Sequence, residues 1–519
     1  SAEAQPTEAA TEAPDDGDTP TATASTIEPT ATTSTGAAAP QGGTLVYARN
    51  IDAKTLDPHF SAQFSERYAL YLLFNTLVGY DPDFNIVPEL AESWDVSDDG
   101  TQITFNMVAN ATFHDGTPCD ATAVEWNINR VLDPEVNSPL RSQLEESIAE
   151  IVVVDATTLQ LNLTQAWRPL LAALGERPGF IISPTAAEEL GEQFALNPVG
   201  SGPFRFVEWT PDNHITLERF EDYWDNDKTN LDGIEIRHVP DGQVQLTMIR
   251  TGEAHLIDAV SPSLLATVEG DDTVAIEELQ SARFAGTHFD VDKPPFDNAD
   301  LRSAINFATN REEIQSVIYA GTGRIATHPL GGGWAFDPSL DNQFQSYDPD
   351  LAAQHLEQAG YDGETLTLTC SNTPSDQQLA QLLQQEYQQA GINVELEVVN
   401  AADAFAMVKD DTTNWTTTSW APRADPDGLL RILWHSTGFQ NTTGYNNPEV
   451  DALLDEAATI YDTEEAKALY RQVEEIVSTN ADYTYHVWPS VFAVRRSEVG
   501  NFVFHPDLII RMREFYLES

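Results

Sequence analysis

The sequence predicts an α/β fold, and three observations support that prediction. The chain has 519 residues and is 41% hydrophobic, enough for two or three domains with a large buried core. Apolar and polar residues alternate in Thr365–Cys370 and again from Ile392 to Val398, as they do in half-buried strands. Between them, Asp376–Ala390 has a helical apolar face and ends at Gly391, a residue suited to a left-handed C-terminal position. Strand, helix and strand with short links imply a parallel βαβ unit.

The first elements along the chain are also predicted from local patterns. Gly43–Tyr47 is a short strand. Pro88–Pro118 contains two short strands that frame an Asp-Asp-Gly turn, with Trp94 near its start and an Asp-Gly turn near its end. Asp120 is placed to cap the amphipathic helix Ala121–Leu132.

Later segments continue the alternation of strands and helices. Ile151–Asp155 and Leu159–Leu163 flank a short polar break and predict a hairpin. Leu301–Ile318 and Asp350–Ala359 each predict one helix, the second ending at Gly360. We find no internal repeat in the sequence.

The charge of the chain is strongly acidic. Asp and Glu total 83 against 26 Lys and Arg, a formal net charge of -57 at pH 7. Such a charge repels nucleic acid and anionic membrane surfaces, so we expect no nucleic-acid partner. Self-repulsion costs most at low ionic strength, where the screening length is about 10 Å or more. We hypothesise that the protein works in a saline exterior, and the alternative is a secreted protein that is simply acidic.

Cysteine usage and short motifs argue against disulfide and metal frameworks. Cys119 and Cys370 are the two cysteines, too few for a disulfide framework. We expect two free, buried thiols, with one bridge as the alternative. No HExxH, CxxC or clustered His pair occurs, so we expect no metal site and no cofactor. The sequence also has no run of about 18 apolar residues of the kind that crosses a membrane.

Residues 1–42 are predicted to be a disordered acidic tether. They contain seven acidic residues, no basic residue and a single large aliphatic residue, Ile27. Such a segment cannot bury enough apolar surface to offset the entropy lost on ordering. It resembles the linker that follows a lipid-anchored cysteine in secreted receptors, and a disordered tail without an anchor is the alternative.

The segment from Pro88 to Pro118, PELAESWDVSDDGTQITFNMVANATFHDGTP, closely resembles the signature block of the family 5 extracellular solute-binding proteins. These are the peptide- and nickel-binding receptors of ATP-driven ABC importers. The resemblance extends from Gly43 to about Phe504, with its pieces in the family's order. The pieces are Gly43–Asp57, Leu90–Gly116, Asp120–Arg130, Asn197–Phe204, Phe296–Ile314, Tyr347–Tyr361 and Tyr445–Ala457. Departures at Met107, Val108 and Ser201 leave the expected fold unchanged.

This resemblance implies a two-lobed periplasmic-binding-protein-like clamshell with an extra subdomain in the first lobe. Lobe I would comprise residues 43–287 and 488–519, with an inserted subdomain at about 76–195. Lobe II would comprise residues 288–487. Crossing segments near His288–Asp290 and His486–Trp488 would serve as hinges, and a solute would be enclosed as the lobes close.

The ligand chemistry is expected near Trp420. In peptide-binding members of the family, a Trp is followed three residues later by an Asp that pairs with the α-ammonium group of the peptide. Trp420 matches that Trp, but the Asp position holds Arg423, whose fork of donors suits a carboxylate or phosphate. We therefore expect Arg423 to contact an anionic or hydrogen-bond-accepting part of the ligand. Pairing of Arg423 with Asp425 or Asp427 is one alternative, and an ammonium-binding role for Asp425 is another.

Aromatic residues supply the other candidate ligand contacts. The resemblance places Tyr485 and Trp488 at the second crossing, Trp334 in a Gly-rich loop that faces the cleft, and Phe64 at the edge of the first lobe. For each of them, and for Trp420, an ordinary role in the core is the alternative. The lone histidines His59, His328 and His486 are weaker candidates for approaching a chelated metal.

The resemblance implies a receptor and not an enzyme. It would be extracellular or periplasmic, tethered through a lipidated N-terminus and monomeric, and would pass an oligopeptide-like solute to the membrane permease of an ABC importer. A secreted hydrolase acting on peptides or glycans is one alternative, although the sequence has no GxSxG motif. A sensor with the same fold but no transport role is the other. The sequence leaves the identity of the ligand open.

Overall fold

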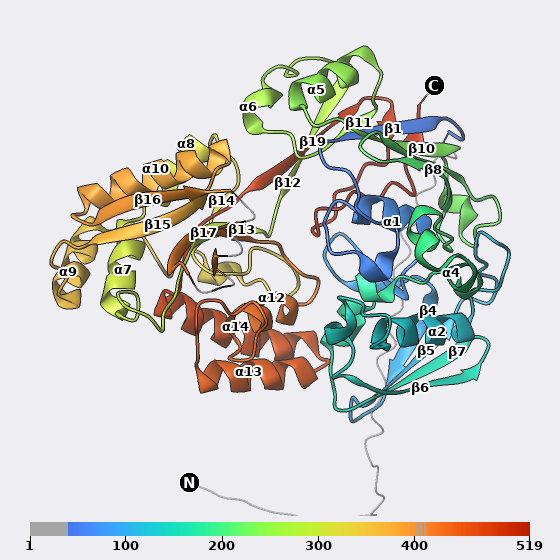
Figure 1. The fold of residues 1–519 in the computed structure, drawn as a ribbon, viewed down its shortest axis with the longest axis horizontal. Coiled ribbons are helices and arrows are strands. Elements are labelled where there is room, and N and C mark those ends of the chain that lie inside the picture. The colour runs from blue at the N-terminus through green and yellow to red at the C-terminus, as the bar shows by residue number, and fades with distance from the viewer. Residues whose placement is uncertain (1–39, 401–402, 405–406, 409, 411, 519) are drawn as a thin grey trace, which may run out of the picture. The chain divides into compact units, whose positions relative to one another are not determined.

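Three large β-sheets organise the part of the chain that the structure, a computed structural model, describes (Figure 1). The described residues are 40–518 except 401–402, 405–406, 409 and 411. Most of the predicted tether, residues 1–42, falls outside them. There are also two small two-stranded sheets. One pairs β2 (Val78–Tyr80) with β3 (Ile86–Pro88), and the other pairs β20 (Val499–Gly500) with β21 (Tyr516–Leu517).

The first large sheet has seven strands in the order β12-β19-β11-β1-β10-β9-β8. Its members are β1 (Thr44–Arg49), β8 (Phe204–Thr210), β9 (His214–Arg219), β10 (Gly233–His238), β11 (Leu256–Ile257), β12 (Val274–Gln280) and β19 (Ser490–Arg496). Strand β1 runs parallel to both β10 and β11. Its Leu45 and Tyr47 side chains are fully buried, which explains the strand pattern predicted there.

The second large sheet has six strands in the order β14-β18-β13-β17-β15-β16. Its members are β13 (Phe284–Phe289), β14 (Arg324–Ile325), β15 (Thr365–Ser371), β16 (Asn393–Val399), β17 (Trp415–Trp420) and β18 (Tyr483–Trp488). Strands β15 and β16 pair in parallel, and α10 (Pro374–Gln389) connects them and packs on both. The predicted βαβ unit is therefore confirmed, and Gly391 has the predicted left-handed backbone, at φ 87°.

A four-stranded antiparallel sheet, β4-β5-β7-β6, contains the predicted hairpins. Its members are β4 (Ala91–Val96), β5 (Gln102–Met107), β6 (Ile148–Asp155) and β7 (Thr158–Leu163). Trp94 pairs with Phe105 across β4 and β5. Helix α2 (Ala121–Leu132) packs on β6 and β7, and the Asp120 carboxylate accepts from the Thr122 and Ala123 N–H groups as the predicted N-cap.

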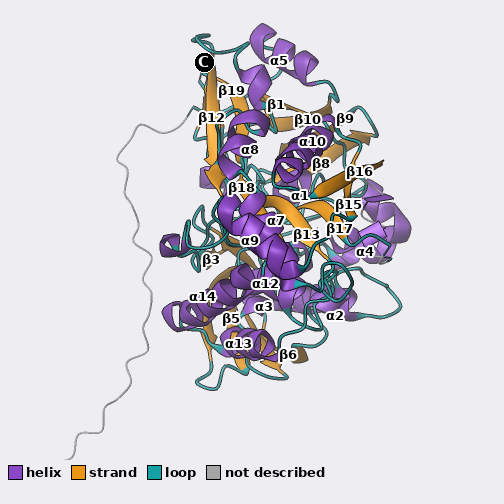
Figure 2. Ribbon diagram, turned by 90° about the vertical axis from the view of Figure 1, so that its left-hand side faces the viewer, coloured by secondary structure: helices purple, strands orange, loops and turns teal. Residues whose placement is uncertain are grey.

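The remaining helices lie outside these sheets (Figure 2). They are α1 (Arg67–Leu73), α3 (Pro169–Ala173), α4 (Pro184–Leu190), α5 (Gly242–Thr251), α6 (Pro262–Leu265), α7 (Ala299–Ala308), α8 (Arg311–Ile318), α9 (Pro349–Ala359), α12 (Asp427–Trp434), α13 (Pro448–Thr459) and α14 (Thr463–Asn480). Helix α9 ends at Gly360 in the left-handed conformation, as predicted. In the described part of the chain, none of the helices combines the length and apolarity that a membrane span needs.

The single helix predicted for Leu301–Ile318 is wrong, because the structure has two helices there, α7 and α8. Thr309 takes an extended conformation between them, at φ −83° and ψ 112°. The Asn310 side chain then accepts from the Glu313 N–H at 3.2 Å and caps the second helix. The Asn310 N–H donates to Glu386 Oε2 at 3.0 Å, so a buried carboxylate holds the break. Apolar spacing continues through the break and hides it from a periodicity argument.

The chain passes between the two largest sheets twice, once between β12 and β13 and once between β18 and β19. The passages are residues 281–283 and Pro489, and Ser281 Oγ donates to the Pro489 carbonyl at 2.7 Å. The predicted crossings differ slightly from these positions. His288 and His486–Trp488 belong to β13 and β18, which are buried throughout and so read as core strands.

Both cysteines are buried and unpaired, as the sequence predicts. Burial raises the pKa of the Cys119 thiol to about 12, and burial followed by the charge of Asp376 raises that of Cys370 to about 11. A thiol with so high a pKa is protonated at neutral pH and unreactive as a nucleophile.

Candidate functional site

The segment from Trp420 to Asp427 joins the end of β17 to the start of α12. Trp420 pairs with Phe284 in the six-stranded sheet, and both Trp420 and Arg423 are half-buried. Asp425 is 4% exposed, and its Oδ1 accepts from the Asp427 N–H at 2.9 Å. A strand end and a helix start therefore fix this segment at both sides.

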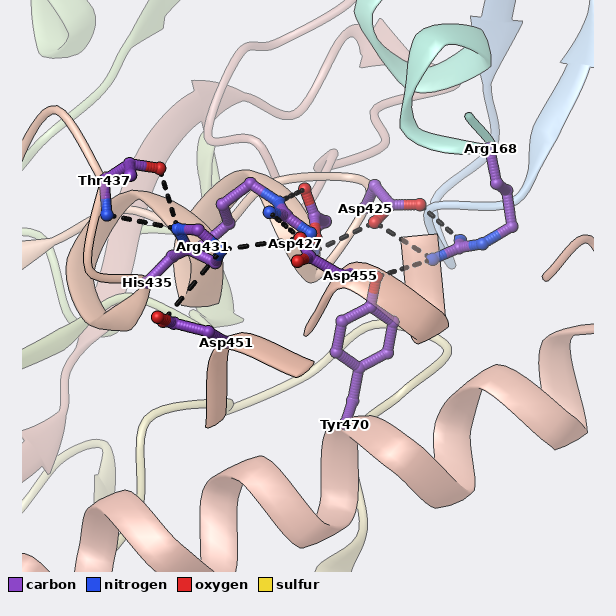
Figure 3. Close-up of polar contacts among 9 residues, drawn as sticks. All are labelled: Arg168, Asp425, Asp427, Arg431, His435, Thr437, Asp451, Asp455 and Tyr470. Carbon is purple, nitrogen blue, oxygen red and sulfur yellow. Dashed lines mark hydrogen bonds and ion pairs between the residues drawn. The ribbon is translucent and has the colours of Figure 1, made fainter. Parts of the chain in front are cut away.

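Asp425 is held by Arg168, which precedes α3 (Figure 3). Arg168 Nη2 donates to Asp425 Oδ1 at 3.2 Å, and Nη1 contacts the other carboxylate oxygen. The same Nη2 donates to the Tyr470 hydroxyl at 2.9 Å, and the guanidinium group lies 4.5 Å from the ring centre of Trp334. Burial disfavours the charge of Arg168, but Asp425, Tyr470 and Asp427 together outweigh that effect, so the pKa of Arg168 is raised above its usual value.

The second carboxylate of the segment has its own cation. Arg431 Nε lies 2.9 Å from Asp427 Oδ2, and Arg431 Nη1 donates to Asp455 at 2.8 Å (Figure 3). The alternative in which Arg423 pairs with Asp425 or Asp427 is therefore not what the structure shows. Within the described residues, Arg423 has no hydrogen bond or ion pair.

Arg423 instead faces charged residues from the turn after α3. Burial disfavours ionisation of Glu176, but the charges of Arg67, Arg423 and Arg177 together lower its pKa below the usual value. The pKa of Arg177 is also lowered, first by burial and then by the charge of Arg67, with Arg423 adding to the repulsion. The charges of three guanidinium groups thus act on one carboxylate.

Arg67 continues this group toward the C-terminal part of the chain. Its Nη2 lies 2.7 Å from Asp507 Oδ2 and 3.6 Å from Glu176 Oε1. Asp507 also accepts from Arg511 Nη2 at 2.6 Å. We call the residues involved the arginine cluster. Its members are Arg67, Glu176, Arg177, Arg423, Asp507 and Arg511.

Two contacts and one electrostatic interaction align the stretch from 168 to 177 with the segment after Trp420. Arg168 pairs with Asp425, and Ala172 packs in one apolar cluster with Ala424 and Phe84. Glu176 then lies within the field of Arg423. The two stretches run in opposite directions along each other, and this alignment places Arg423 beside the arginine cluster.

A narrow pocket beside this alignment contains two of the sequence-predicted residues, Trp334 and Arg423. Its volume is about 10 Å³, and its wall is formed by the glycine-rich loop Gly331–Ala335 and by residues 422–429. The Trp334 ring stacks edge-on against Tyr470 at 5.9 Å and carries the Arg168 guanidinium on its face. The loop predicted to face the cleft therefore lies against the predicted ligand segment.

The other predicted residues are divided between the arginine cluster and the core. Phe64 is 37% exposed and lies 5.9 Å from the Arg67 guanidinium, next to the arginine cluster. Tyr485 and Trp488 are almost fully buried in the apolar cluster that packs on the six-stranded sheet, and Trp420 contacts the same cluster. Within the described residues, the Tyr485 hydroxyl and Trp488 Nε1 have no hydrogen-bond partner.

Two of the lone histidines, His59 and His328, have structural partners, whereas neither ring nitrogen of His486 has a hydrogen-bond partner within the described residues. His59 lies 3.0 Å from the Phe180 carbonyl, and His328 lies 2.7 Å from Glu474 and 3.0 Å from Asp341. Burial lowers the pKa of His486 to about 3, and the charge of Arg311 adds to that effect. Across the described residues, no three His, Cys, Asp or Glu side chains are grouped to hold a metal ion.

Sequence reasoning missed Arg67, Arg168, Glu176 and Arg177. The sequence does contain a signal that could have found them. The chain has 26 Lys and Arg residues against 83 Asp and Glu residues, and several of the basic residues lie among apolar neighbours in the sequence. Arg67 begins an otherwise apolar helix and is 2% exposed, and Arg168 and Arg177 each precede a proline. A buried cation in so acidic a protein marks a position where charge is needed.

Comparison with known proteins identifies the family of the chain. The family description "Bacterial extracellular solute-binding proteins, family 5 Middle" matches residues 85–441. The chain is 30% identical to the glutathione-binding protein GsiB of Salmonella paratyphi A, covering 89% of this chain and 92% of that protein. It is 28% identical to the GsiB of Pectobacterium atrosepticum, covering 89% and 91%.

Solved structures show the same fold. The periplasmic binding protein DppA of Helicobacter pylori, in complex with peptide STSA, matches with a TM-score of 0.80 and 27% identity, covering 92% of this chain and 99% of that one. The AgaA protein of A. tumefaciens R10, in complex with agropinic acid, matches with a TM-score of 0.78 and 25% identity, covering 92% and 99%. These relatives are substrate-binding receptors and not enzymes. The mixed α/β two-lobed clamshell is therefore confirmed, and the chain belongs to the family 5 bacterial extracellular solute-binding proteins, the receptors of ABC importers.

Proposed function

We propose that this protein is a receptor that encloses a small peptide-like solute between its lobes and delivers it to the permease of an ABC importer, without turning it over. The observation that supports the ligand site is the position of Arg423. It lines a pocket with Trp334, lies beside the arginine cluster and has no partner among the described residues. In this proposal Arg423 binds an anionic or accepting group of the solute, where peptide-binding relatives would offer an Asp to an ammonium group.

The other predicted ligand residues keep distinct roles in this proposal. Trp420, Trp334 and Phe64 provide aromatic surface for the solute, and Tyr485 and Trp488 offer donors from the core side. Asp425 is a less suitable acceptor for an ammonium group, because both of its carboxylate oxygens already face Arg168. Arg168 would have to release Asp425 before a ligand could use it.

The first experiment identifies the solute and tests Arg423. Mass spectrometry of whatever co-purifies with the protein gives candidate ligands, with glutathione and short peptides as the first probes because of the named relatives. Calorimetric titration of Arg423→Ala with the solute so identified should show at least about tenfold weaker binding, equal to about 1.4 kcal/mol. Arg205→Ala, which removes an exposed partner of Glu218, is the matched control and should bind normally. Unchanged affinity of Arg423→Ala would remove Arg423 from the site.

The competing functions make different predictions. A secreted hydrolase would convert peptides or glycans into products, whereas a receptor returns the bound solute intact. A sensor with this fold would bind its ligand, but deletion of its gene would leave uptake of the solute unchanged. Loss of uptake on deletion, together with binding and no turnover, is the outcome expected for the receptor.

We propose further that residues 1–42 form a tether through a lipidated N-terminus and that the receptor acts as a monomer outside the cytoplasmic membrane. The domain boundaries proposed are residues 43–287 and 488–519 for lobe I, with a subdomain at about 76–195, and residues 288–487 for lobe II. Light scattering reports the oligomeric state, and limited proteolysis followed by mass spectrometry reports the linker and the boundaries.

A further inference from the structure

We propose that the arginine cluster is a binding site for a solute with two acid groups, such as a peptide that carries a carboxylate side chain in addition to its C-terminal carboxylate. This inference deepens the proposed receptor function and rests on it. It assigns the net charge of the solute, which the family resemblance leaves open.

The first support is the balance of charge within the cluster. The cluster has four guanidinium groups and two carboxylates: Arg67 forms ion pairs with Glu176 and Asp507, Arg511 forms one with Asp507, and the charges of Arg177 and Arg423 also act on Glu176. The excess is two positive charges. The nearby ion pairs use their own partners, because Arg168 pairs with Asp425 and Arg513 pairs with both Glu89 and Glu514.

Glu66 is next to Arg67 in sequence, but within the described residues its carboxylate forms no ion pair with the arginine cluster. It accepts from Ser61 Oγ at 2.6 Å and from the Gln63 N–H at 2.9 Å. Both of these neutral donors belong to the loop before α1, and both bind the same oxygen, Oε2. The guanidinium groups keep their excess charge for another partner.

The second support is the number of donors without acceptors. Arg67 is 2% exposed, yet its Nε has no hydrogen-bond partner among the described residues. Arg177 Nε is also buried and without one, while its Nη2 donates to the Gln63 carbonyl at 3.3 Å. Arg423 has no hydrogen-bond or ion-pair partner in the described part of the chain. Buried donors of charged groups are costly to leave unpaired, so an acceptor is expected there when the site is filled.

The third support is the contrast with the rest of the molecule. A chain with a net charge of -57 repels anions at long range, so an anionic solute must overcome electrostatic repulsion as it approaches. Concentrating four of 26 basic residues around one turn offsets the repulsion locally. A guanidinium fork binds a carboxylate through two parallel hydrogen bonds, so two acid groups would use the excess charge fully.

The chemistry also limits the alternatives. A neutral solute would leave both excess charges uncompensated in a half-buried site, and a cation would add to them. Phe64 and Tyr71 lie beside the arginine cluster, and the Arg511 guanidinium is 3.6 Å from the Tyr71 ring centre. A solute whose acid groups bind the cluster would therefore have aromatic side chains next to it. This combination favours an organic acid over a free inorganic anion.

The test compares solutes that differ only in one acid group. Calorimetric titration of the full chain with Ala-Glu and with Ala-Gln, at one fixed salt concentration, should show Ala-Glu bound at least about tenfold more tightly. Arg177→Gln should reduce that preference to less than about threefold. Arg141→Gln, which removes an exposed cation paired with Glu145 at 3.0 Å, is the matched control and should keep the preference. Circular dichroism confirms that each variant is folded, and Arg177→Lys provides a second variant that retains the charge.

The outcomes separate this inference from the proposed function. Equal affinity for Ala-Glu and Ala-Gln overturns the two-acid inference and leaves the peptide receptor intact. Binding of glutarate, a two-acid solute without a peptide bond, in the absence of any peptide binding keeps the inference and overturns the peptide-like ligand. Absence of binding for every acid-bearing probe, or a preference that Arg177→Gln does not reduce, overturns the inference.

Discussion

Arg168 and Asp425 are 257 positions apart in the chain, and their side chains form a buried ion pair that joins the stretch before α3 to the segment before α12. Arg168 also donates to the Tyr470 hydroxyl of α14 and lies over the ring of Trp334 in the Gly-rich loop. The pair therefore connects that loop and α14 to the ligand segment. With the packing of Ala172 against Ala424, it connects the predicted subdomain to the segment that contains Arg423.

Removing one partner of this pair should loosen the contact. Arg168→Ala leaves the Asp425 carboxylate buried without its cation, a change that typically costs about 3–5 kcal/mol. Opening the contact hydrates Asp425, so we expect a larger radius of gyration by X-ray scattering of the ligand-free variant. The double variant Arg168→Met with Asp425→Leu removes both charges and should stay closer to the parent. Identical scattering for all three proteins would show that the pair does not hold the contact closed.

Asp482, a buried acid just after α14, should make the stability of the protein fall as pH rises. Burial raises the pKa of Asp482 to about 7, although Trp434 Nε1 donates to its Oδ2 at 2.6 Å. The folded protein therefore binds a proton that the unfolded chain, with an ordinary Asp pKa, has already released. The contribution of protonated Asp482 to the free energy of unfolding is present at low pH and is lost as pH passes through about 7. We expect a loss of about 1.4 kcal/mol between pH 6 and pH 8.

Urea unfolding at pH 6 and pH 8 measures that contribution. Asp482→Asn should lose less stability than the parent over the same interval, because an amide does not ionise. Glu386, whose pKa burial raises to about 7, is unchanged in both proteins and cancels in the comparison. A variant and parent with parallel pH profiles would contradict the assignment.

Salt should stabilise this protein. A net charge of -57 produces self-repulsion that is screened over about 3 Å at 1 M salt and about 30 Å at 0.01 M. We therefore expect the thermal unfolding midpoint to rise between low and molar NaCl. Sucrose, an uncharged excluded solute, is the control for effects other than screening. No gain in molar salt would rule out the hypothesis of a saline exterior.

The thiols should be unreactive in the folded state. Cys119 is 1% exposed and Cys370 is fully buried, and burial keeps both protonated at neutral pH. We expect no reaction with a chromogenic disulfide reagent at pH 8 in buffer and two thiols per chain in denaturant. A count of zero in denaturant would indicate a disulfide.

Local sequence patterns predicted the fold well where one physical signal decided the structure. The cap at Asp120 and the left-handed glycines at Gly360 and Gly391 fixed helix ends, and period-two alternation located β15 and β16. The break at Thr309 escaped because it depends on Glu386, which is remote in sequence. Tertiary hydrogen bonds of that kind have no local pattern.

The candidate site was predicted only in part for a similar reason. The departure at Arg423 could be read from the sequence, since it differs from the residue expected after Trp420. Its neighbours Arg67 and Arg177 belong to other elements, and no spacing rule connects them to Arg423. Their convergence follows from the packing of Ala172 against Ala424, which sequence reasoning has no means to foresee.

The position of β19 has a consequence for how the chain can fold during synthesis and export. This strand comes from residues 490–496, yet it lies inside the seven-stranded sheet between β12 and β11. Until it has been made, β12 has no partner in that sheet and β11 is an unprotected edge. The first sheet to emerge is therefore the last to be completed, and premature collapse of the nascent chain would leave it with an open gap.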